Sequence, residues 1–86
     1  MFFIFLETCQ YEYGVDYTLN DLDKIPNWPL RAQSADECQQ MCASIEDCSH
    51  FTFNIATNRC YPKHGVIAGR TDFADAVSGE KNCKVR

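Results

Sequence analysis

Cysteine is the residue type with the most chemical potential in this sequence, at six of 86 residues. Cysteines pair as disulfides in oxidising compartments, whereas clusters of thiolates in other proteins ligate zinc. The spacings here include Cys-x3-Cys, Cys-x5-Cys and Cys-x11-Cys, but not the Cys-x2-Cys pair of common zinc modules. The spacing therefore favours three disulfides over a metal site. The cysteines concerned are Cys9, Cys38, Cys42, Cys48, Cys60 and Cys83.

Six cysteines allow fifteen disulfide pairings, and the sequence alone does not choose among them. Cys38 and Cys42 are one helical turn apart, so their side chains run parallel and each should bond outward, to the sheet that the helix covers. The short return after the helix favours Cys42 with Cys48. Cys38 can then reach Cys60, which leaves Cys9 to pair with Cys83.

Groups for catalysis are scarce, because oxidised cysteines leave no thiolate nucleophile. Only two histidines are present, and His50 falls on the polar face of an expected strand, where a general base is the less favoured interpretation. Neighbouring acidic residues lack the spacing of a calcium-binding loop and are interpreted as solvated loop residues. They are Asp21 with Asp23 and Asp72 with Asp75. The sequence therefore predicts a protein that is not an enzyme and carries no cofactor or metal.

A candidate binding loop begins at Tyr61, and its proposed ligand-binding residues are Tyr61, Lys63 and His64. A tyrosine ring can stack on the C–H face of a sugar, while lysine and histidine donate hydrogen bonds that fix its orientation. The alternative is an ordinary solvated loop. Trp28 lies between two prolines and is expected to plug the core or a small satellite cluster, with a recognition role as the alternative.

One helix has clear signals. Ser34 and Glu37 form a predicted capping box, in which the Glu37 side chain reaches back to the Ser34 amide. Apolar residues follow at helical spacing and define the face expected to be buried, which holds Cys38, Met41, Cys42 and Ile45. The face expected to contact water holds Glu37, Gln39, Gln40 and Ser44.

The rest of the chain predicts strands. Residues 11–19 alternate apolar and polar with a possible bulge at Gly14. Residues 50–61 read as a hairpin that turns at Thr57–Asn58, with one apolar face (Phe51, Phe53, Ile55) and one polar face (His50, Thr52, Asn54). Residues 62–72 read as a long loop and 74–83 as a strand interrupted at Ser78–Gly79, while Phe2–Leu6 is a strand or connector. This order predicts an α+β fold, an antiparallel sheet with one helix packed across it.

The size and net charge of the chain limit the kinds of partner that it is expected to have. At 86 residues the chain is predicted to be a single domain, 1–86, with a disulfide-framed core over 9–83. A net charge of −4 disfavours a nucleic-acid partner, and the apolar run 1–6 is too short to insert across a membrane. That run does not resemble a secretory signal, yet six cysteines indicate an oxidising compartment. We therefore expect a piece of a longer secreted protein.

The sequence resembles the PAN/apple domain over Cys9 to Cys83. The motifs that carry the resemblance are Gly14-Val15-Asp16-Tyr17, Asp21-Leu22, Ser34-x-x-Glu37-Cys38-Gln39-x-x-Cys42, Cys48, Phe51-Thr52-Phe53, Cys60 and Ser78-Gly79 before Cys83. The resemblance implies a small disulfide-rich fold, in which a curved antiparallel sheet of about five strands cradles one helix. It also implies pairing of the first cysteine with the sixth, the second with the fifth and the third with the fourth.

Apple domains occur in extracellular proteins, including protease zymogens, growth-factor precursors, plant receptors and the microneme adhesins of apicomplexan parasites. This compact, acidic chain resembles the microneme group most. The resemblance implies a secreted adhesive module, one of several tandem copies, that binds a cell-surface glycan or glycoprotein during host-cell attachment. The alternative is an assembly module that packs against neighbouring apple domains or against a serine-protease domain in a zymogen.

Overall fold

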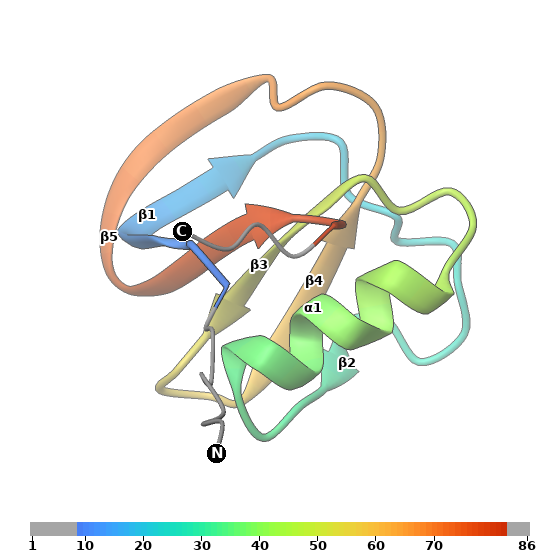
Figure 1. The fold of residues 1–86 in the computed structure, drawn as a ribbon, viewed down its shortest axis with the longest axis horizontal. Helices are drawn as coiled ribbons and strands as arrows, with labels where there is room; N and C mark the ends of the chain where they lie inside the picture. The colour runs from blue at the N-terminus through green and yellow to red at the C-terminus, as the bar shows by residue number, and fades with distance from the viewer. Residues whose placement is uncertain (1–8, 83–86) are drawn as a thin grey trace, which may run out of the picture.

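The computed structural model describes residues 9–82, which fold into one helix packed on one face of a five-stranded antiparallel sheet (Figure 1). The strand order across the sheet is β1-β5-β3-β4-β2. This arrangement confirms the predicted α+β fold. The expected strand or connector Phe2–Leu6 lies outside the described residues. The elements are β1 Glu12–Thr18, β2 Leu30–Arg31, α1 Ala35–Ser44, β3 His50–Asn54, β4 Arg59–Lys63 and β5 Gly69–Glu80.

The helix α1 begins as the sequence predicts, at the Ser34 cap. The Ser34 hydroxyl accepts a hydrogen bond from the Glu37 amide at 3.1 Å. The Glu37 carboxylate, however, accepts from the Gln33 amide at 2.5 Å, and not from the Ser34 amide as the capping box predicts. The carboxylate thus holds the chain one residue before the cap. The Ser34 bond satisfies one of the free amides at the helix N-terminus, and the Glu37 carboxylate places negative charge in the first turn, where the helix dipole favours it.

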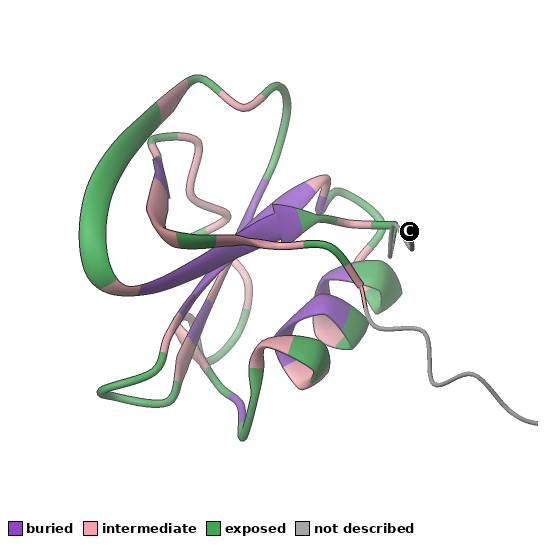
Figure 2. Cartoon of the chain, turned by 60° about the vertical axis from the view of Figure 1, so that its left-hand side comes forward, coloured by how far each residue is buried: buried purple, intermediate pink, exposed green. Residues whose placement is uncertain are grey.

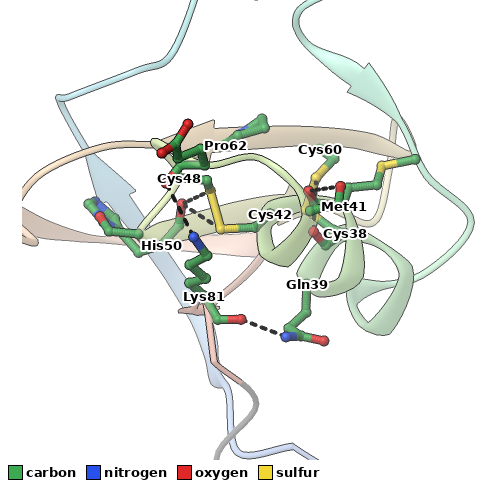
Figure 3. The surroundings of a disulfide bond; sticks show 12 residues. Cys38, Gln39, Met41, Cys42, Cys48, His50, Cys60, Pro62 and Lys81 are labelled. Carbon is green, nitrogen blue, oxygen red and sulfur yellow. Dashed lines mark hydrogen bonds between the residues drawn. A yellow bond between two sulfur atoms is a disulfide. The ribbon is translucent and has the colours of Figure 1, made fainter.

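The predicted solvent exposure of Gln39 is wrong. Only 8% of the residue is exposed, and its side-chain amide donates to the Lys81 carbonyl at 2.6 Å (Figure 3). The chain leaving β5 passes beside the helix at this point, which no helical periodicity could indicate. Gln39 therefore ties α1 to the end of β5.

Two disulfides fasten the helix to the rest of the fold. Cys38 bonds to Cys60 in β4, and Cys42 bonds to Cys48 just before β3, with Cα–Cα distances of 5.4 and 5.3 Å. These pairs confirm two of the three predictions and overturn the zinc alternative for these four cysteines. Cys9 is also disulfide-bonded, whereas its predicted partner Cys83 lies outside the described residues.

The central strand β3 does not have the exposed polar face that its alternation predicts. It pairs with β4 on one side and with β5 on the other. The face bearing Phe51 and Phe53 packs on α1 with the disulfides. The opposite face, with His50 and Thr52, is also buried, at 1% and 5% exposure. Strand alternation shows two faces but not what covers each of them.

The predicted long loop 62–72 is shorter in the structure. Pro62 and Lys63 belong to β4, and β5 already begins at Gly69, so the connection covers only residues 64–68. The predicted interruption at Ser78–Gly79 is also absent, because β5 runs unbroken for 12 residues. Ser78 pairs with both β1 and β3, and Gly79 pairs with β3, and this pairing holds them extended despite their low strand propensity.

Gly79 has a packing reason to be glycine. A Cβ added there would lie 2.8 Å from the Tyr11 ring and 3.0 Å from the Phe51 ring. The two rings meet edge to face, with centroids 5.8 Å apart. The glycine therefore makes room for an aromatic contact on the helix side of the sheet.

Candidate functional site

The long strand β5 bends, and this bend creates the candidate site. Its second half pairs with β3 on one side and with the start of β1 on the other, while its first half pairs with the end of β1, where Val15 opposes Asp72 and Thr18 opposes Gly69. The register shifts between Tyr13 and Val15, across Gly14 at φ +73°, so the predicted irregularity lies where the sequence placed it. The extra residues, however, are in β5, between Asp72 and Val77. The bent pair, called here the β1–β5 ribbon (residues 15–18 and 69–73), lies across the sheet from α1 (Figure 2).

Buried hydroxyl groups hold the ribbon on the sheet. The Tyr17 amide donates to the Thr52 hydroxyl at 3.0 Å, and the Ser78 hydroxyl donates to the Val15 carbonyl at 2.6 Å. Because the Ser78 proton is committed to Val15, the Thr52 hydroxyl donates to Ser78 across the 2.7 Å between their oxygens. The polar residues of the second sheet face therefore satisfy the backbone of the strand that crosses them.

A groove of about 310 Å³ lies between the ribbon and strands β3 and β4. Its walls come from four separate parts of the chain. They meet only because β1 and β5 bend over the sheet. The lining residues are Asp16, Thr18, Leu19, Asp21, Thr52, Asn54, Tyr61, Lys63 and Phe73.

A partly buried ion pair lines the groove. Lys63 is buried, with 5% of its side chain exposed, and its ammonium lies 2.5 Å from the Asp21 carboxylate, which is 38% exposed. The backbone holds Asp21 in place, because it bridges to Lys63 and the next amide, Leu22, donates to the Pro62 carbonyl at 3.0 Å. The interpretation of Asp21 as a solvated loop residue is therefore wrong.

The ring of Tyr61 is held from behind by Trp28. The two rings meet edge to face with centroids 5.3 Å apart, and the Trp28 indole donates to the Pro62 carbonyl at 3.4 Å. Trp28 is half-buried and does not line the groove. Its expected role as a packing residue agrees with this placement, and it fixes an aromatic surface for a ligand to contact.

The three residues proposed from the sequence to bind a ligand do not lie in one place. Tyr61 and Lys63 line the groove. His64 is exposed and lines a smaller depression of about 140 Å³, which shares Asp21 with the groove. Sequence reasoning missed Asp16, Asn54 and Phe73, and no local signal indicated them, since each comes from a different strand.

The groove offers hydrogen-bonding groups beside apolar surface. Carboxylates, an amide and hydroxyls can bind hydroxyl groups of a ligand, and Tyr61, Phe73 and Leu19 can contact its C–H surface. Among residues 9–82, no three histidine, cysteine or acidic side chains gather as a metal site would require. Over the same residues, no helix has the length and apolar character needed to cross a lipid bilayer.

His50 lies buried beside the ribbon and has an unusual environment. Its ring is 5.7 Å from that of Tyr17, and its Nδ1 lies 2.7 Å from the Ser49 hydroxyl. Its Nε2 is buried and makes no hydrogen bond with any described residue. Burial lowers the pKa of the His50 imidazole below its ordinary value, and the nearby Lys63 and His64 lower this pKa further. The neutral imidazole is thus the form that the fold accommodates.

We expect this environment to make stability depend on pH. Above pH 6.5 His50 is neutral in both states and its burial has no effect on the pH dependence. As the pH drops below 6.5 the unfolded chain protonates His50 while the folded chain resists, so stability falls, and it levels off below the lowered folded pKa. Urea unfolding at pH 7.5 and pH 5 should show lower stability at pH 5. The variant His50→Phe, which keeps a ring against Tyr17, should reduce this difference. An unchanged difference in the variant would assign the pH dependence to other groups.

Known proteins are similar to this chain in sequence. A family model described as PAN domain matches residues 9–83. Micronemal protein 4 of Toxoplasma gondii is 46% identical over 53 residues, which cover 62% of this chain and 9% of that protein. Microneme antigen L2 of Sarcocystis muris is 31% identical over 55 residues, covering 64% of this chain and 39% of that protein. The chain thus spans well under half the length of these relatives.

A solved structure is similar in fold. It is the TgMIC4-A5/lacto-N-biose complex, which superimposes with a TM-score of 0.66 at 25% sequence identity and covers 87% of this chain and 100% of that one.

Proposed function

The chain belongs to the PAN domain family, and we propose that it is a non-enzymatic adhesive module of a secreted, microneme-type protein that binds a cell-surface carbohydrate. The observation that carries the proposal is the likeness to TgMIC4-A5, which was solved in complex with lacto-N-biose. The microneme relatives support a secreted location. They are longer than this chain, and we propose that the chain is one of several tandem modules in a longer protein.

The groove is the proposed carbohydrate site. Sugars are bound where an aromatic surface contacts their C–H face and fixed polar groups orient their hydroxyls. Tyr61 supplies the ring and Lys63 a donor held by Asp21, while Asn54 offers both a donor and an acceptor. His64 remains a proposed contact from the adjacent depression.

The same groove supports the proposal that the module is not an enzyme. Glycoside hydrolysis uses two carboxyl groups, one as acid and one as base or nucleophile. Asp21 is held in the ion pair with Lys63, so Asp16 is the one carboxylate lining the groove that has no ion-pair partner among residues 9–82. The described cysteines are all disulfide-bonded and offer no thiolate. The groups present suit recognition of hydroxyls.

Replacing Tyr61 tests the site. The variant Tyr61→Leu keeps apolar packing on Trp28 but removes the ring face, so we expect its Kd for lacto-N-biose to rise about tenfold, or ~1.4 kcal/mol. Titration followed by NMR chemical shifts, with sugar up to about 10 mM, detects affinities in the millimolar range.

The matched control is Tyr13→Leu, because Tyr13 is 71% exposed on β1 and does not line the groove. It should bind like the unaltered chain. If the unaltered chain shows no shifts with lacto-N-biose and no binding on a glycan array, the carbohydrate assignment fails. If Tyr13→Leu weakens binding as much as Tyr61→Leu, the ligand lies elsewhere.

The alternative function is assembly with neighbouring domains of the same polypeptide. Large apolar residues that are well exposed favour it, among them Leu19 at 65% and Val66 at 76%. Sedimentation of a tandem fragment separates the two functions, since an extended fragment whose domains do not contact one another contradicts a packing role.

The assignment of residues 1–86 to one domain also stays a prediction.

A further inference from the structure

Two arginines face the same side of the sheet as the groove. The register of β2 with β4 places Arg31 directly opposite Arg59, and the register of β3 with β4 places Asn54 opposite Arg59. Residues directly opposed in an antiparallel sheet project from the same face. Asn54 lines the groove, and so does Tyr61, two residues along β4 from Arg59. The arginine pair therefore continues the groove toward the β2 edge.

Neither arginine of this pair forms an ion pair within the described residues. Over residues 9–82 the ion pairs are Lys63 with Asp21 and Arg70 with Glu12, and neither Arg31 nor Arg59 takes part in one. Like charges placed directly opposite each other destabilise a sheet. Arg31 is exposed and Arg59 is half-buried, so both are open to a ligand. An anion bound between them would relieve the repulsion.

The groove itself has the opposite character. Two carboxylates line it, those of Asp16 and Asp21, against the single ammonium of Lys63. An anionic group is therefore disfavoured inside the groove and favoured beside it. Tyr61 and Arg59 are two residues apart on one strand, or about 7 Å. One sugar unit linked to another spans this distance.

We propose that the module recognises an acidic oligosaccharide, whose uncharged sugar occupies the groove and whose carboxylate or sulfate group binds Arg31 and Arg59. This inference rests on the proposed carbohydrate-binding function. Guanidinium groups suit the anionic end, because their planar fork donates two parallel hydrogen bonds to a carboxylate or sulfate. Because the groove carries more negative than positive charge and the arginines are positive, the uncharged sugar is expected in the groove and the charged sugar beside the arginines.

The probes are lacto-N-biose and its derivatives that are sialylated or sulfated at the 3′ or 6′ position. At low salt, at least one anionic derivative should bind the unaltered chain about tenfold more tightly than lacto-N-biose. This gain should shrink as salt is raised, since exposed charges are screened over ~10 Å at 0.1 M. A gain with the sialylated sugars alone identifies a carboxylate ligand, and a gain with the sulfated sugars alone identifies a sulfate.

Substitutions show which residues bind the anionic group. Arg31→Gln and Arg59→Gln should each remove most of the extra affinity for the anionic derivative and leave the affinity for lacto-N-biose unchanged. Arg59→Lys should restore it in part, because lysine supplies the charge without the fork. Lys81→Gln is the control, since it removes one positive charge from a residue that lines neither the groove nor the adjacent depression. The arginine variants should unfold at the same or higher urea concentration than the unaltered chain, because the opposed charges are gone.

Equal affinity for neutral and anionic sugars would overturn this inference and leave the carbohydrate function standing. A gain that survives in both arginine variants would also overturn it, since the anion would then bind elsewhere. Absence of binding to every probe would overturn the carbohydrate function and this inference together.

Discussion

Replacing Cys38 and Cys60 together with alanine will lower the free energy of unfolding by about 3 kcal/mol. The bond joins cysteines with a sequence separation of 22. In the chain-entropy model its loss raises the conformational entropy of the unfolded chain, which lowers the free energy of unfolding by roughly this amount. Both cysteines are fully buried beside Phe51 and Phe53, so the lost sulfur contacts add to the effect. Small domains have only about 5–15 kcal/mol in total. Urea unfolding monitored by circular dichroism measures the change.

The second helix disulfide provides the comparison. Cys42 and Cys48 are separated by 6 positions, for which the same model gives a smaller loss, about 2 kcal/mol. The double variant Cys42→Ala/Cys48→Ala should therefore retain more stability than Cys38→Ala/Cys60→Ala. Equal losses in the two variants would show that local packing, and not loop closure, determines what these bonds contribute.

Asp21→Asn should produce the second large effect, because it leaves the buried Lys63 ammonium without its carboxylate. Removing one partner of a fully buried pair costs about 3–5 kcal/mol. Here the Asp21 carboxylate is 38% exposed and solvent screens the pair, so we expect a loss of about 2 kcal/mol in the free energy of unfolding. Binding of lacto-N-biose should weaken as well, since both side chains line the groove.

A double variant separates the two sources of this loss. Asp21→Asn/Lys63→Met removes the lone charge and should recover most of the stability, but not the affinity for sugar. Asp23→Asn is the control, since Asp23 is exposed and lies outside the groove, and its effect should stay within about 0.5 kcal/mol. If Asp21→Asn unfolds like this control, the ion pair contributes nothing to stability.

Sequence patterns predicted the elements whose contacts are local. The cap at Ser34 and the spacing of Cys38 and Cys42 predict a helix with a buried face, and helical geometry then limits where its cysteines can bond. The turn near Asn58 is also local, because Asn54 accepts hydrogen bonds from the two amides that follow Ile55. The hairpin of β3 and β4 follows from this turn.

The tertiary structure decided where the site lies. Alternation in β3 shows that Thr52 and Phe53 face opposite ways, but not that a second strand pair covers Thr52. The β1–β5 ribbon covers Thr52 only because β1 pairs with β5, which lies more than fifty positions away in sequence, and because β5 bends. No residue of a strand carries information about such a distant partner.

Local chemistry thus determined the helix and the hairpin, and it favoured the Cys42–Cys48 bond, because residues close in sequence interact directly. The groove, the Asp21–Lys63 pair and the opposed Arg31 and Arg59 arose only when distant strands came into register. Strand pairing is made by backbone groups that every residue has in common, so the side chains that it brings together follow from the whole fold and not from their own sequence neighbours.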